Sequence, residues 1–169
     1  MIFYVIAALI LAAGLALFAM ASSHQTLLDD AVRASMLARL DRLTSSAPAS
    51  WGRMDVAQML HHLAGALRMA IGDLAIPPRQ SILRRFPIRQ LIIFVLPFPQ
   101  GAPTAPALVA REKFDFETER ADVRGLIASF ASREIAHWPD HPAFGPLTRE
   151  QWGVMAWKHA DHHLRQFGK

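Results

Sequence analysis

The chain has 169 residues, which is enough for one domain with a substantial apolar core. Its formal net charge is +4, but the lysines and arginines are dispersed and there is only one tyrosine, which argues against a nucleic-acid-binding surface. It contains no cysteine, so any metal must be held by histidines and carboxylates rather than by thiolates.

The N-terminal stretch is apolar and carries no charged side chain over residues 1–21. That is about the length a helix needs to cross a hydrocarbon core of ~30 Å. We therefore expect residues 1–22 to be a transmembrane anchor, through which the protein would contact a membrane. Three arginines follow it closely, and the positive-inside rule then predicts a single-pass protein whose domain faces the cytoplasm. They are Arg33, Arg39 and Arg42.

A cleaved signal peptide is the alternative interpretation of the same stretch. Ala19, Met20 and Ala21 form a small-x-small cleavage pattern, and the protein would then be exported. Two features favour the anchor: no basic residue precedes the apolar run, and the run is longer than the usual ~7–15 residues of a signal peptide.

Residues 27–169 are expected to form one all-α domain with four main helices, because apolar residues recur at helical spacing and no β-alternation appears. Asp55 with Gln58, and Thr148 with Gln151, have the spacing of capping boxes that open the second and the last helix. The expected helices span residues 27–43, 55–75, 117–135 and 152–167.

The stretch between the second and third helices is less regular. Residues 79–96 combine four arginines with many apolar residues, which fits either a crossover packed on the domain or a segment lying in a lipid headgroup layer. Residues 97–106 are rich in proline and form a long loop.

The last helix carries three histidines within five positions. His159 and His163 are four residues apart, so they lie on the same face, which should point inward. His162 lies about 60° from His159 and is expected at the rim. On the second helix, His62 falls near the buried stripe whereas His61 falls on a polar face.

Three neutral imidazoles from two facing helices would leave a fourth metal position open, as in catalytic rather than structural zinc sites. The HExxH mechanism is excluded, because position 160 is alanine and no glutamate follows His159. The alternative is that the inward histidines are hydrogen-bonded core residues. Three further histidines are set aside as solvated or capping residues: His24, His137 and His141.

Two motifs together resemble a known group of proteins. Residues 51–63 read WGRMDVAQMLHHL, and residues 157–168 read WKHADHHLRQFG. Together they resemble the DinB/YfiT-like superfamily of metalloenzymes, and the GAPTAP loop at 101–106 with HPAFGPLT at 141–148 resembles a branch known only as a domain of unknown function. The resemblance covers residues 28–168, and an N-terminal apolar segment is not a usual feature of that superfamily.

The resemblance implies an up-down four-helix bundle in which His62, His159 and His163 bind a divalent metal such as zinc or nickel. Characterised relatives are thiol-dependent transferases or isomerases that use low-molecular-weight thiols such as mycothiol, bacillithiol or glutathione. It therefore implies a metal-dependent S-transferase acting on such a thiol and an electrophile.

Asp161, His162 and Gln166 are candidates for orienting a ligand or lining the rim. The rival hypothesis is a non-catalytic, membrane-tethered binding or interaction protein with a structural or vestigial histidine cluster. The sequence leaves a homodimer open, and it identifies neither the substrate nor the thiol.

Overall fold

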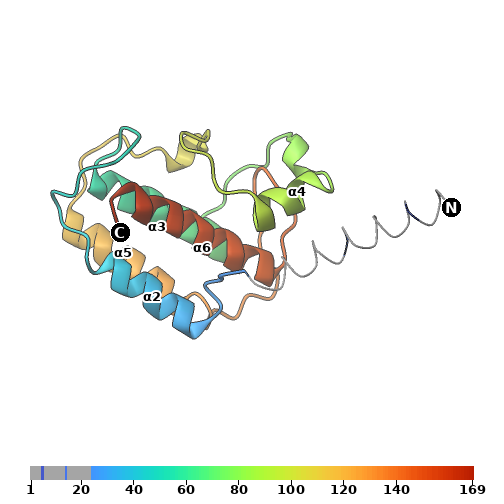
Figure 1. Ribbon diagram of the computed structural model, residues 1–169, viewed down its shortest axis with the longest axis horizontal. Coiled ribbons are helices and arrows are strands. Elements are labelled where there is room, and N and C mark those ends of the chain that lie inside the picture. The colour runs from blue at the N-terminus through green and yellow to red at the C-terminus, as the bar shows by residue number, and fades with distance from the viewer. Residues whose placement is uncertain (1–4, 6–13, 15–23) are drawn as a thin grey trace.

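The computed structural model describes Val5, Gly14 and residues 24–169 (Figure 1). This part of the chain is mostly helical, with five α-helices and no strand. The four longer helices pack against one another: α3 contacts α5 and α6, and α2 contacts the same two helices. They are α2 (Asp30–Leu40), α3 (Val56–Ile71), α5 (Phe116–Ser129) and α6 (Arg149–Gln166).

Local caps fix where these helices begin and end. Asp55 accepts a hydrogen bond from the Gln58 backbone N–H at 2.8 Å and donates its own backbone N–H to Gln58 Oε1 at 3.1 Å. Thr148 and Gln151 form the same reciprocal pair before α6, so both predicted capping boxes are confirmed. α3 ends at Gly72, whose φ of 87° is a left-handed conformation that favours glycine. α5 is shorter than predicted, since it ends at Ser129 rather than near residue 135.

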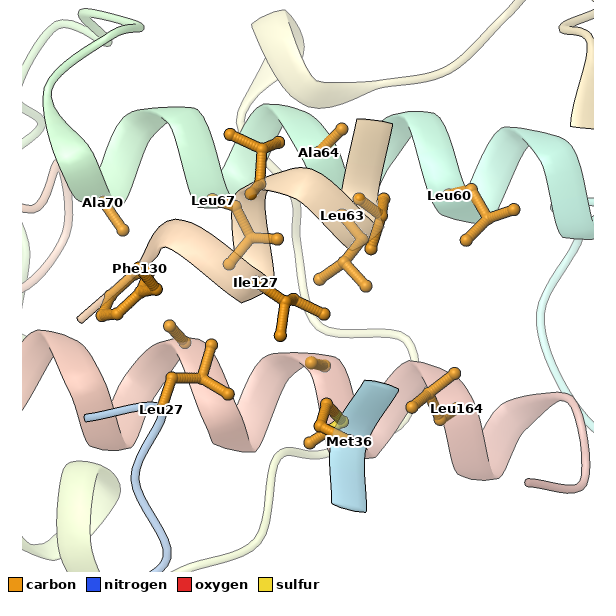
Figure 2. Packing of buried hydrophobic residues seen from close by; sticks show 14 of the residues in the cluster. Leu27, Met36, Leu60, Leu63, Ala64, Leu67, Ala70, Ile127, Phe130 and Leu164 are labelled. Atoms are coloured by element: carbon orange, nitrogen blue, oxygen red, sulfur yellow. The ribbon is translucent and has the colours of Figure 1, made fainter. Parts of the chain in front are cut away.

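One apolar core lies between the four helices. Figure 2 shows Leu63 and Leu67 of α3 pointing toward Ile127 of α5 and the facing side of α6. These three side chains are at most 1% exposed, and burial of each contributes roughly 1.5–3 kcal/mol to folding. Leu27, which precedes α2, is fully buried and its backbone N–H donates to the Gly153 carbonyl at 3.1 Å. The segment that precedes α2 is therefore held against α6 by both the core and this hydrogen bond.

Residues 76–108, here called the roof segment, lie over the α3 and α6 side of the domain (Figure 1). Its η2 turn packs on α6 and its η3 turn packs on α3. Lys158 of α6 holds η2 in place, because its Nζ donates to the carbonyls of Ile92 at 2.6 Å and Ile93 at 3.0 Å. The segment contains η1 (Ile82–Arg84), α4 (Ile88–Gln90), η2 (Leu91–Val95, a π-helical turn) and η3 (Pro106–Leu108).

The fold prediction needs a correction at the N-terminus. The transmembrane helix expected over residues 1–22 falls, apart from Val5 and Gly14, outside the described residues. Among the residues that the structure describes, no helix combines the length and the apolar character needed to cross a membrane. This finding overturns the prediction of a helical bundle preceded by a transmembrane helix, and with it the predicted single-pass membrane localisation.

Candidate metal centre

Three imidazole nitrogens converge between α3 and α6. His159 Nε2 lies 3.1 Å from His62 Nε2 and 3.0 Å from His163 Nε2, and the three atoms all lie within 4.8 Å of one another. An ion bound tetrahedrally at 2.0–2.1 Å from each nitrogen would need separations of about 3.3 Å. These three histidines could therefore hold a metal ion after small adjustments of the rings.

Hydrogen bonds on the far side of two rings fix which nitrogen carries the proton. His62 Nδ1 lies 2.8 Å from the Leu108 carbonyl, which only accepts, so Nδ1 carries the hydrogen. Gln166 Nε2 donates to the Trp51 carbonyl at 2.6 Å, so its Oε1 faces His163 Nδ1 at 2.8 Å and accepts from it. Both rings therefore present an Nε2 lone pair toward His159.

Hydrogen bonds alone cannot satisfy all three Nε2 atoms, because two acceptor nitrogens face the single Nε2 of His159. His159 Nε2 can donate at most one hydrogen, so one of its two close neighbours must face it lone pair to lone pair. Protonation does not resolve this, because burial lowers the pKa of all three rings: that of His163 to about 3, that of His159 well below its usual range, and that of His62 also downward. A cation accepting all three lone pairs fits the donor set.

The neighbouring residues predicted to orient a ligand or line the rim lie in different places. Gln166 is buried against His163, and His162 lies at the rim with its ring edge-on to Trp51, 5.5 Å between centroids. Asp161 is not brought to the cluster; it forms ion pairs of 2.7 Å with Arg39 and of 2.7 Å with Arg165.

His61 turns away from the cluster, as its place on the helix predicts. Its Nδ1 lies 3.1 Å from a Glu119 carboxylate oxygen, and its ring stacks on Phe114 with centroids 3.9 Å apart. The two adjacent histidines of α3 therefore contact different helices: His61 contacts α5 and His62 contacts α6.

The three-histidine cluster opens on a large cavity of about 1130 Å³. Its walls are mostly apolar side chains of α3, α6 and the roof segment, and among residues 24–169 no aspartate or glutamate lines it. His162 faces the same cavity. The apolar lining includes Leu63, Ala66, Leu67, Ala70, Leu83, Ile92, Phe98, Met155 and Ala156.

Sequence reasoning missed three parts of the site. The carbonyls of Leu108 and Trp51 are backbone groups with no side-chain signal. The WG pair at 51 and 52 carried an indirect signal, because Gly52 has a φ of 83° and a Cβ there would lie 2.8 Å from Gln166 Nε2. His141 was set aside, yet it lines the cavity.

A helical domain whose buried histidine cluster opens on an apolar cavity belongs to the class of candidate metalloproteins. The chain belongs to the family described as protein of unknown function (DUF1569), whose model matches residues 21–169. No curated protein and no solved structure matches the chain. The match confirms the prediction of a domain of unknown function, whereas the comparisons give no support for membership in the DinB/YfiT-like superfamily.

Proposed function

We propose that this protein binds one divalent metal ion through His62, His159 and His163 and uses it in a thiol-transfer reaction. The observation that carries the proposal is the convergence of three neutral Nε2 atoms, two of them held as acceptors by the Leu108 carbonyl and by Gln166. The reaction class comes from the resemblance of the two histidine motifs to DinB-like thiol transferases, which this proposal extends to the chain.

The chemistry of the ligands favours zinc or nickel. Neutral imidazoles suit these ions, whereas magnesium and calcium prefer oxygen ligands, and the cluster found among the described residues consists of three imidazoles. Three protein ligands leave a position for a substrate, which is the arrangement of catalytic rather than structural zinc. When bound, such an ion lowers the pKa of a thiol or water at its open position and so makes it nucleophilic at neutral pH.

The residues that line the cavity would position the electrophilic substrate and limit its contact with water. Phe98 and Ile92 of the roof segment and Met155 of α6 line the cavity, so an apolar electrophile would be enclosed beside the histidines. The thiol would enter past His162 and Trp51 at the rim. In the reaction its sulfur would bond to the electrophilic carbon while the bond from that carbon to a leaving group breaks. The leaving group would depart as an anion, and the thiol proton would pass to solvent.

Metal content tests the first half of the proposal. We expect about one zinc or nickel ion per chain in protein purified without chelator, measured by elemental mass spectrometry. His163→Ala should lose the ion, because two imidazoles remain, whereas His61→Ala should keep it, because that ring pairs with Glu119 instead. A wild-type chain that holds no metal and takes up none on addition would refute the proposal.

A thiol panel tests the second half. Glutathione, bacillithiol and mycothiol would be offered with an activated aryl chloride, from which the thiol sulfur displaces chloride. Turnover should follow metal content across wild type, His163→Ala and His61→Ala. Stoichiometric metal without turnover for any thiol would instead favour a metal-binding protein that catalyses no thiol transfer.

A further inference from the structure

The end of the cavity away from the three-histidine cluster is lined by His141, whose tautomer is fixed by hydrogen bonds from the backbone. Its Nδ1 accepts hydrogen bonds from the backbone N–H groups of Ala143 at 3.0 Å and Phe144 at 3.2 Å. In a neutral imidazole the only hydrogen must then lie on Nε2. Both of the ring's hydrogen bonds within the described part of the chain are made by Nδ1, and the residue lines the cavity. The cavity therefore has a donor, not an acceptor, at this end.

Positive charge accompanies this donor. Arg79 lines the same cavity, and its side chain forms no ion pair among residues 24–169. Arg84 lies close by, with its Nη2 donating to the Pro142 carbonyl at 3.1 Å, and it has no carboxylate partner in the described chain either. No acidic residue occurs between Asp73 and Glu112 in the sequence, and Asp140, which precedes His141, is not among the residues that line the cavity. An anion is therefore the ligand group that this end would attract.

Helix α6 sets the separation between the two ends. The His141 ring lies against Trp152, with centroids 5.3 Å apart, and Trp152 precedes His159 by seven residues. Seven residues of α-helix span about 10 Å. Between the two ends, the cavity is lined by small, uncharged side chains of α3 and α6, namely Ala66, Ala70 and Ala156. An apolar ligand could therefore extend from one end to the other.

We infer that the substrate is an amphipathic carboxylate: its anionic group lies against Arg79 and His141, and its apolar body runs along α6 toward the three histidines. This inference rests on the proposed function, since it assigns a substrate class to the same cavity. Two donors face one carboxylate, one charged and one neutral, which is a favourable arrangement for anion binding.

Paired probes of equal length test this inference on the 169-residue chain loaded with zinc. Isothermal titration would compare decanoate with decanamide, which has the same chain but no charge. We expect decanoate to bind at least about tenfold more tightly, since a hydrogen bond between a charged donor and a charged acceptor is stronger than one to a neutral amide. Arg79→Gln should remove this preference and leave decanamide binding unchanged. Arg42→Gln makes the same charge change outside the cavity and should keep the preference.

His141→Asn is the second variant, because the asparagine oxygen can still accept from the backbone N–H groups, while its shorter side chain places no donor at the position of the imidazole Nε2. It should weaken decanoate binding with little loss of stability. Equal affinity for the two probes in wild type, or an unchanged preference in Arg79→Gln, would overturn the inference. Zinc content measured on the same samples separates the two proposals: full zinc without a decanoate preference refutes this inference alone, whereas absent zinc refutes the metal centre.

Discussion

Gln166→Leu is the sharpest test of how the histidine cluster is held in place. Gln166 is 2% exposed and bridges the His163 Nδ1–H and the Trp51 carbonyl. Leucine would leave the buried His163 Nδ1–H and the part-buried Trp51 carbonyl without this partner. A fully buried group loses about 1–3 kcal/mol in this way, so we expect the free energy of unfolding to fall by about 1–6 kcal/mol. Loss of a group that orients a metal ligand typically weakens metal binding about 10–100-fold.

Two assays on the same samples separate these effects: zinc affinity by competition with a chromophoric chelator, and urea unfolding of the metal-free chain. Gln166→Glu keeps an acceptor for His163 but has no N–H for the Trp51 carbonyl, so it should lose stability while retaining zinc affinity. Gln80→Leu, an exposed glutamine outside the cavity, should change neither quantity. Wild-type zinc affinity in Gln166→Leu would show that the hydrogen bond does not orient His163.

Zinc at a hundred times its dissociation constant should raise the free energy of unfolding by about 2.7 kcal/mol, seen as a higher melting temperature that His159→Ala abolishes. Burial lowers the pKa of His141 to about 4 and that of His163 to about 3, from 6.5. The unfolded chain therefore binds more protons below pH 6.5, and metal-free protein should lose up to roughly 1.4 kcal/mol per pH unit per histidine as pH falls toward 4, with no such change above pH 7 in urea titrations. Gly153→Ala should cost roughly 1–3 kcal/mol in the same assay, because a Cβ there would lie 2.8 Å from Leu28 Cγ and closer still to Thr26 Oγ1. Gly125→Ala, with nothing within 4 Å of its Cβ, should instead stabilise the chain by about 0.5–1 kcal/mol.

The parts of the fold predicted correctly depend on short-range spacing. Asp55 with Gln58 and Thr148 with Gln151 act within one helical turn, so the sequence alone locates both helix starts. The four-residue spacing of His159 and His163 places both rings on one face in the same way. The choice of His62 over His61 required only the apolar stripe of the second helix.

The parts that were not predicted depend on backbone groups and long-range packing. The Leu108 carbonyl reaches His62 from 46 positions along the chain, and Gln166 reaches the Trp51 carbonyl across 115 positions. No residue pattern predicts which backbone carbonyl accepts such a hydrogen bond, because every residue has a carbonyl. The placement of Asp161 also depends on long-range packing, because its partner Arg39 lies 122 positions away. Its position next to histidines in the sequence suggested a role at the cluster, but in the structure its carboxylate pairs with arginine instead.

The contact between His62 and His159 joins residues 97 positions apart, whereas His159 and His163 share a single helical turn. An unfolded chain therefore has only two of the three proposed ligands close together in sequence, and the third joins them only after α3 and α6 have packed. Metal uptake would then be a late event in the maturation of the protein, and its rate in a refolding experiment could not exceed the rate at which these helices dock. The ion would report on completed tertiary structure, not merely on helix content.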